Sequence, residues 1–261
     1  MALILWTAAA SWLPATRLHA GITGRTSRSS TARPIASASA TATFLETVFD
    51  TLDYEAILLS DSGEEDDDVD DTAVEYTYGE SDLGFFLSVL ATALATADTS
   101  ARLPKVSGFC DLGGGKGQLA LAAAHAEPER LSGPCVSLEI IPELHAIAAS
   151  AVSRAAELDA AYARVSAVRG DLFRGDSLAQ SVEGAAVCFC YASLFASESG
   201  THAEQLSAAL AAASLPPGAV VATINRQLCE ADGWRVAAPS IEGPTPQEDA
   251  QTGVVYFYCR G

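Results

Sequence analysis

Residues 109–118 read FCDLGGGKGQ, an apolar run that ends in an acid and is followed by glycines at alternate positions. The apolar residues before Asp111 predict a buried strand, and the Ala/Leu-rich segment from Gln118 onward predicts a helix. In an open α/β sheet such a junction lies at the carboxyl end of a strand, where these folds bind ligands. Glycines let the backbone approach a ligand, and the first N–H groups of the helix attract a carboxylate or phosphate. The stretch therefore predicts an α/β fold with a ligand site at this turn.

Strand-like and helix-like segments alternate on both sides of the turn. Their short links indicate a mostly parallel sheet with right-handed crossovers. The last two strand-like runs have no helix between them, so we expect them to pair antiparallel. The predicted strands are 106–112, 135–140, 165–169, 185–191, 220–225, 234–238 and 254–260, and the predicted helices are 43–59, 83–94, 118–126, 142–161 and 203–213. The prediction is a seven-stranded, mostly parallel sheet with an antiparallel C-terminal strand pair.

Three ligand classes compete for the glycine turn. A P-loop requires Ser or Thr after its lysine, but a glycine follows Lys116. A dinucleotide fingerprint requires GxGxxG, and Gln118 occupies the position of its last glycine. The pattern Asp-x-Gly-x-Gly-x-Gly is matched in full by Asp111, Gly113, Gly115 and Gly117. The turn therefore resembles the first motif of class I S-adenosylmethionine methyltransferases, which have a Rossmann-like fold.

Two further acids fall at the ends of predicted strands. Glu139 ends the second strand, 22 residues past Gly117. A carboxylate there can accept both ribose hydroxyls, as the acid of dinucleotide folds does. Asp171 follows the third strand and can accept from an adenine amine. Three acids at the ends of three successive strands predict one cofactor site.

A more specific resemblance covers residues 74–226. TYGE (77–80), FCDLGGGKGQ, LE, RGDLF and GAVVATI occur in the order and approximate spacing found in non-SET histone-lysine methyltransferases of the disruptor-of-telomeric-silencing type. The resemblance implies that a loop of Tyr78, Gly79, Glu80 and Ser81 covers the methionine part of the cofactor. It also implies cofactor contacts from Gln118 and Leu172.

The match breaks after the fourth predicted strand. There the family has an Asn-rich turn beside the transferred methyl group, whereas residues 189–195 read FCYASLF, without Asn. The same segment excludes the NPPY motif of amine-directed DNA and glutamine methylases. Tyr191 is the candidate catalytic-site residue, as part of the acceptor channel. The sequence also lacks the family's basic nucleosome-binding tail, so the cofactor-binding half of the resemblance alone implies a lysine acceptor.

Charge is distributed unevenly along the chain. The 261 residues include 33 Asp and Glu against 15 Lys and Arg, a formal net charge of −18. Nucleic-acid affinity comes mostly from Lys and Arg that neutralise phosphates, so this balance argues against direct nucleic-acid binding. Eight acids crowd residues 61–71, DSGEEDDDVDD. Like charges at that density repel one another and predict a solvated loop, or alternatively a docking segment for a basic partner.

The first 42 residues have the composition of a targeting leader. No acid precedes Glu46, and the apolar run at 2–13 has the length of a signal-peptide core but is too short to span a bilayer. A Ser/Thr/Ala/Arg-rich stretch follows, as in organellar transit segments. Such a two-part leader resembles those of proteins sent to complex algal plastids; the alternative locations are the nucleus and the cytoplasm. We expect 1–42 to be leader, 43–72 to hold a helix and the acidic loop, and 73–261 to form the methyltransferase domain, with no membrane span in the mature chain.

The motifs together predict S-adenosylmethionine as cofactor and a methyl acceptor as partner. The six cysteines form no CxxC pair and no zinc-type Cys/His cluster, so we expect no metal and small buried thiols. The first hypothesis is methyl transfer to a lysine of a basic protein. Two alternatives stay open: a methyltransferase for a small organellar metabolite, and a non-catalytic cofactor-binding module whose acidic segment docks a basic partner.

Overall fold

A seven-stranded sheet forms the centre of the protein, seen in a computed structural model that describes residues 36–54, 56–57, 82–99, 107–195, 197–244 and 252–260. The strands are β1 (Gly108–Leu112), β2 (Cys135–Glu139), β3 (Val165–Arg169), β4 (Ala185–Cys190), β5 (Val220–Ile224), β6 (Trp234–Pro244) and β7 (Thr252–Arg260). Their order is β3-β2-β1-β4-β5-β7-β6, and β7 runs antiparallel to both of its neighbours. This confirms the predicted Rossmann-like α/β fold with a mostly parallel sheet and an antiparallel C-terminal pair.

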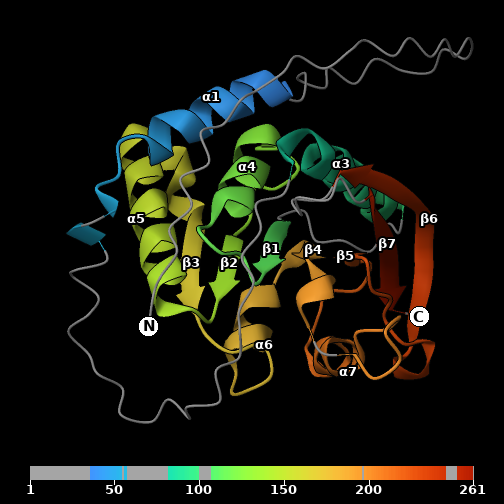
Figure 1. Cartoon of the computed structure of the whole chain (residues 1–261). Helices are drawn as coiled ribbons and strands as arrows, with labels where there is room; N and C mark the ends of the chain where they lie inside the picture. Colours follow the sequence, from blue (N-terminus) through green and yellow to red (C-terminus); the bar gives the residue numbers. More distant parts are fainter. Residues whose placement is uncertain are drawn as a thin grey trace, which may run out of the picture. The chain divides into compact units, whose positions relative to one another are not determined.

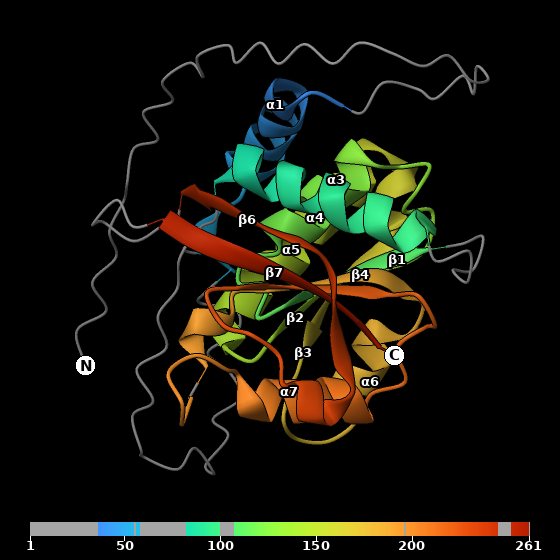
Figure 2. The same ribbon diagram turned by 90° about the vertical axis from the view of Figure 1, so that its right-hand side faces the viewer.

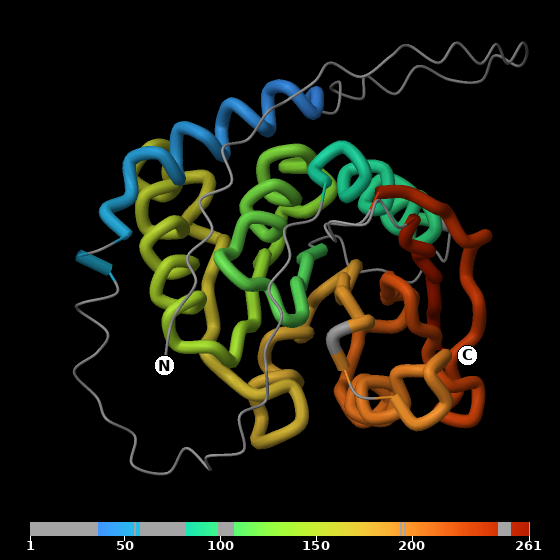
Figure 3. The backbone as a smooth tube through the Cα atoms, in the orientation of Figure 1, coloured from blue at the N-terminus to red at the C-terminus, as the bar shows by residue number. Residues whose placement is uncertain are grey.

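Helices cover both faces of the sheet (Figures 1 and 2). One face carries α3 (Leu83–Thr99), α4 (Gln118–Ala126) and α5 (Pro142–Leu158), and the other carries α6 (Ser177–Val182) and α7 (Glu204–Ala212). Helix α1 (Ala38–Phe49) crosses above α4 and α5, as the tube in Figure 3 shows. The short 3-10 helices are η1 (Ala160–Arg164), η2 (Ala192–Leu194) and η3 (Glu230–Asp232). None of the helices in the described part of the chain combines the length and apolar character needed to cross a bilayer.

Each face of the sheet has its own apolar core. Under α3 and α4, the ring of Phe86 meets Phe109 and Phe189 edge-on, with centroids 5.8 and 5.3 Å apart. Under α6 and α7, the core includes Leu138 and Leu206. Strands β1 and β4 are buried at every position, because parallel strands covered on both faces contact no water. Both sequences are therefore mostly apolar, with Asp111 as the one charged residue among them, which is why these strands could be predicted.

The cysteines of this fold are free thiols. Cys110, Cys135, Cys188 and Cys190 are buried, and desolvation raises the pKa of Cys188 to about 12. These four act as small apolar groups, as predicted. Cys259, which we expected to be buried as well, is partly exposed on β7.

The folded part begins earlier than the predicted leader boundary. Helix α1 starts at Ala38, within residues 1–42, and the side chain of Ser37 caps it by accepting from the N–H of Ala40. Thr41 is fully buried in this helix. Alanine- and serine-rich sequence is typical of both transit segments and helix starts, which explains the difference. A leader would therefore end before Ser37.

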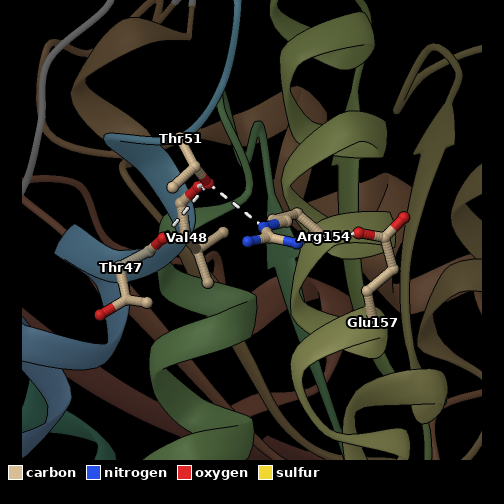
Figure 4. A network of polar contacts seen from close by, with 5 residues as sticks. All are labelled: Thr47, Val48, Thr51, Arg154 and Glu157. Carbon is tan, nitrogen blue, oxygen red and sulfur yellow. Dashed lines mark hydrogen bonds and ion pairs between the residues drawn. The ribbon is translucent and has the colours of Figure 1, made fainter.

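Helix α1 is tied to α5 by a polar network (Figure 4). The Nε atom of Arg154 donates to the hydroxyl oxygen of Thr51 at 3.3 Å, and that hydroxyl donates to the carbonyl oxygen of Val48 at 3.0 Å. Arg154 also forms an ion pair with Glu157 at 3.0 Å. On the α4 side, the ring of Phe44 stacks on His125, with centroids 4.5 Å apart. The middle and the C-terminal end of α1 are thus attached to the helical layer.

Helix α1 ends at Phe49 in place of the predicted 59, and α3 continues from the predicted 94 to Thr99. Three further elements also differ from the sequence prediction. Helix α5 ends at Leu158, and η1 follows as a separate turn in place of the predicted continuation to 161. Helix α6 was not predicted, because a six-residue helix shows too little periodicity. Strand β6 continues from the predicted 234–238 to Pro244, with register shifts near Ala238. Strand β6 can include Pro239 and Pro244 because it is the edge strand of the sheet.

Candidate cofactor-binding and active site

The glycine turn joins β1 to α4 and folds back against the end of β2. The N–H groups of Gly113 and Gly114 both donate to the carbonyl oxygen of Leu138, at 2.9 and 3.0 Å. A Cβ atom on Gly114 would lie 2.1 Å from the hydroxyl oxygen of Ser137, so only glycine permits this approach. Gly117 caps α4 with φ +80°, in the left-handed region, and the other two alternate glycines of the motif also have positive φ. The motif spacing is therefore explained by the backbone path.

Asp111 lies at the end of β1, directly before this turn, and only 3% of its surface is exposed. Its Oδ2 atom is buried without a hydrogen-bond partner among the described residues. Burial, together with the neighbouring Glu139 carboxylate, raises the pKa of Asp111 to about 8. A buried carboxyl without a donor is unfavourable, so this oxygen is suited to receive a cation or an N–H donor from a ligand.

Glu139 is the last residue of β2, and both oxygens of its carboxylate accept hydrogen bonds from backbone N–H groups. Its Oε2 atom accepts from the N–H of Gly115 at 2.8 Å, and its Oε1 atom accepts from Ile140 and Ile141, each at 2.8 Å. A carboxylate has about four acceptor sites, so one of them remains, on Oε2. Glu139 thus holds the glycine turn in place, and it has less capacity for two ribose hydroxyls than the sequence alone suggested.

Asp171 follows β3, and its carboxylate bends back on its own loop. The Oδ1 atom accepts from the N–H of Phe173 at 2.7 Å, while Oδ2 lies 3.6 Å from the Nε of Arg174. About a quarter of the side chain, 26%, is exposed. Leu172, the next residue, is buried in the core under α6. The pair therefore offers one available carboxylate oxygen beside an apolar side chain.

The parallel sheet brings the three predicted acids to one edge. Strands β3, β2 and β1 are adjacent and parallel, so Asp171, Glu139 and Asp111 follow in that order along their carboxyl ends. Neighbouring strands lie about 4.8 Å apart, so the row extends over roughly 10 Å. That span suits an elongated ligand.

The remaining predicted residues stand as follows. Gln118 is the first residue of α4 and is partly buried. Tyr191 is the first residue after β4, packs against the core under α3, and has a buried hydroxyl without a partner among the described residues. The loop of Tyr78, Gly79, Glu80 and Ser81 and the acidic run 61–71 lie outside the described residues.

Sequence reasoning missed a second polar group at the same sheet edge. Arg226 follows β5, and its Nη2 atom lies 3.4 Å from the carbonyl oxygen of Ser193, in η2 after β4. The Nη1 atom of Arg226 and the hydroxyl of Ser193 are buried and lack partners in the described part of the chain. The available signal was an arginine placed immediately after an apolar strand and Asn225.

The site is suited to a ligand that carries both signs of charge. Asp111 can take a cationic group, and the first N–H groups of α4, which have no partner within the helix, can take a carboxylate. Glu139 and Asp171 each keep an acceptor for a hydroxyl or an amine. No three His, Cys, Asp or Glu side chains gather as metal ligands within the described ranges.

Comparison with known proteins gives matches among solved structures only. No family model matches the sequence, and no curated protein matches it. The chain is similar to precorrin-6y C5,15-methyltransferase from Geobacter metallireducens at 16% identity and a TM-score of 0.44, over 67% of this chain and 87% of that one. It is similar to an rRNA methyltransferase from Streptomyces viridochromogenes at 17% identity and a TM-score of 0.41, over 71% and 90%.

A third similar structure is magnesium protoporphyrin IX methyltransferase from Synechocystis PCC 6803 with bound SAM, at 18% identity and a TM-score of 0.42, over 71% and 88% of the two chains. Likeness at this level carries no assignment of substrate. The fold assignment rests on the strand order described above.

Proposed function

We propose that this chain is an S-adenosylmethionine-dependent methyltransferase. The observation that carries the proposal is the buried, partnerless Oδ2 of Asp111 beside the glycine turn, in line with Glu139 and Asp171 on the next two strands. The cofactor combines a cationic sulfonium and ammonium with a carboxylate, a ribose diol and an adenine. The ammonium, the carboxylate, the ribose and the adenine each have a counterpart along this edge.

Each chemical group of the cofactor would contact a residue of complementary charge or hydrogen-bonding capacity. Asp111 would accept from the ammonium, and the start of α4 would hold the carboxylate. Glu139 would accept from a ribose hydroxyl at Oε2, and Asp171 from the adenine amine, with Leu172 beside the ring. From the family resemblance, Tyr78 to Ser81 would cover the methionine part.

The bound cofactor supplies an electrophilic methyl group for in-line displacement. The chain's own task is to align the acceptor with that group and to keep water out. The acceptor would lie over the ends of β4 and β5, next to β1, where Tyr191 is placed. His125 is not a base for this step: it sits at the far end of α4 from the glycine turn, with Nδ1 2.5 Å from the hydroxyl of Tyr162.

Two acceptor classes have support. The ordered motifs TYGE and DLGGGKGQ support the lysine of a basic protein, whereas the partnerless guanidinium nitrogen of Arg226 supports a small anionic molecule. Labelled methyl transfer from the cofactor into separated protein and small-molecule fractions of the source cell distinguishes them. D111A and E139A serve as controls, with transfer reduced at least tenfold. Cofactor binding without label in either fraction would contradict catalysis and support the binding-module alternative.

The location of the protein bears on the acceptor. The leader composition supports import into a plastid, whose stroma holds no nucleosomes. A fluorescent fusion of the full chain tests this, and signal in the plastid would exclude a histone acceptor in the cell. Signal in the nucleus would contradict the plastid proposal and favour a protein lysine.

A further inference from the structure

Arg226 is a cation with an incomplete set of partners. It is half-buried, and its Nη2 atom makes a long contact of 3.4 Å to the carbonyl oxygen of Ser193. Its Nη1 atom is fully covered and has no acceptor among the described residues. Guanidinium groups removed from water are normally paired with a carboxylate, a phosphate or several carbonyl groups. This arginine therefore lacks the partner that its environment requires.

No described acid supplies that partner, since no carboxylate of the described ranges forms an ion pair with Arg226. The carboxylate of Glu204, which follows the loop after η2, accepts instead from the N–H and hydroxyl of Ser199, at 3.2 and 2.7 Å. A neutral donor, the Ser193 hydroxyl, is also buried without a partner at the same place in the fold. Two donor groups without acceptors favour an external anion.

The backbone that carries Arg226 is held rigidly. Asn225 adopts φ 65°, and it bonds Val254 twice: its N–H donates to the carbonyl oxygen at 2.7 Å, and its Oδ1 accepts from the N–H at 3.0 Å. The hydroxyl of Thr223 donates to the carbonyl oxygen of Arg226 at 2.6 Å. On the other side, the N–H of Gln227 donates to Thr201 at 2.9 Å. A left-handed non-glycine residue fixed in this way holds the backbone position from which the arginine side chain extends.

The strand order puts this arginine beside the proposed cofactor site. Three acids lie at the carboxyl ends of β3, β2 and β1, and the next strands along the same edge are β4 and β5. Residue Cys190 of β4 pairs with Leu112 of β1 on one side and with Thr223 of β5 on the other. The edge therefore carries acids on one half and Arg226 on the other, with Tyr191 at the junction.

We propose that Arg226, assisted by Ser193, binds an oxyanion of the methyl acceptor, so that the acceptor is a small molecule with a carboxylate or phosphate group. This inference rests on the proposed methyltransferase function. A cationic cofactor on the acidic half and an anionic acceptor on the arginine half would place their reacting atoms over the end of β4.

The test uses the full chain saturated with S-adenosylhomocysteine. Benzoate and phenyl phosphate are the oxyanion probes, and benzamide is the neutral probe of similar shape. We expect calorimetry to detect benzoate or phenyl phosphate but not benzamide, and R226A to weaken that binding at least tenfold. R235A is the matched control and should bind the probes as the wild type does. Arg235 is exposed on β6, level with the start of β5, whereas Arg226 follows the end of β5.

A second arm measures labelled methyl transfer into a small-molecule extract resolved by anion exchange. We expect label in retained, anionic products and a loss of at least tenfold in R226A. Prior phosphatase treatment of the extract abolishes transfer for a phosphate monoester acceptor and leaves it intact for a carboxylate. R226K keeps the charge but not the bidentate geometry, so it should lose less than R226A.

The outcomes separate this inference from the proposed function. Cofactor binding within twofold of the wild type in R226A, together with lost probe binding or transfer, supports it. Equal probe binding or transfer in R226A and wild type overturns it, as does label confined to proteins or unretained products. If R226A does not fold, the inference is tested with R226K and with the wild type. Unchanged transfer in R226K together with equal binding of benzoate and benzamide by the wild type would then overturn it. Failure of the wild type to bind cofactor would overturn the proposed function itself, and this inference with it.

Discussion

At the scale of single residues, Asp111 has the most unusual environment in the site. Its carboxyl is buried beside a second carboxylate and has an oxygen without a donor. The raised pKa follows from burial first and from Glu139 second. The sequence placed this acid at a strand end, but its charge state depends on Glu139, which lies 28 positions away in the chain and contacts the same turn.

The ionisation of Asp111 gives a pH dependence of stability. Its pKa is near 3.8 in the unfolded chain and about 8 in the folded one. Between these values the folded state holds a proton that the unfolded state lacks. The stabilisation is therefore complete below about pH 4 and is lost as the pH rises toward 8, by up to about 1.4 kcal/mol per pH unit.

D111N removes this titration while keeping the shape of the side chain. From pH 5.5 to 7.5, we expect the unfolding free energy of the wild type to fall by about 2 kcal/mol more than that of D111N. Urea unfolding of both proteins at the two pH values measures it. Parallel pH dependence of the two proteins would show that Asp111 is ionised in the empty site.

At the scale of elements, the β1–α4 turn depends on contact between Gly114 and Ser137. We expect G114A to lower the unfolding free energy by about 1–3 kcal/mol, because its methyl group would overlap the Ser137 hydroxyl. S137A removes that hydroxyl, so the double variant should regain part of the loss. A double-mutant cycle by urea unfolding measures the coupling, and strictly additive effects would contradict the close approach.

The turn after β5 contains a residue in a strained backbone conformation, Asn225 with φ 65°. Asn225 tolerates the left-handed conformation better than residues without a short polar side chain. We expect N225A to lower the unfolding free energy by about 1–3 kcal/mol, through strain and the lost bond to Val254. N225G relieves the strain and should lose less. Thermal and urea unfolding of both variants compare them, and greater loss in N225G would contradict this account.

Elements with strong local signals could be predicted from the sequence, and the others could not. Strand β3 and helix α4 occupy the predicted ranges, because a short run rich in valine and an Ala/Leu helix after a glycine turn are both encoded locally. Helix α6 was missed because it is short. The end of β6 was missed because its pairing with β7 continues past Pro239 only through register shifts.

At the scale of the whole molecule, α1 decides where the folded protein starts. It packs on α3, α4 and α5 rather than on the sheet. We expect a chain that starts at Ala36 to keep the unfolding free energy of the full protein. One that starts at Thr43 should lose about 1–2 kcal/mol with the Ser37 cap and the first turn. Equal urea midpoints for the two truncated chains would contradict this account and would favour the leader boundary at residue 42 that the composition predicts.

The site as a whole could be predicted only in part. Parallel topology alone brings Asp171, Glu139 and Asp111 together, so three acids at strand ends were enough to find that half. Arg226 belongs to the other half, and its environment depends on contacts between loops that no local pattern encodes. Likewise, the three amides that occupy Glu139 become visible only in three dimensions.

Calorimetry of S-adenosylmethionine binding to the full chain tests the central claim most directly. We expect saturable binding by the wild type, weakened at least tenfold in D111A and in E139A, with R235A unchanged. D111A loses the partner of the cofactor's ammonium, and E139A loses both a ribose contact and the support of the glycine turn. No binding by a folded wild type at millimolar cofactor would contradict the account.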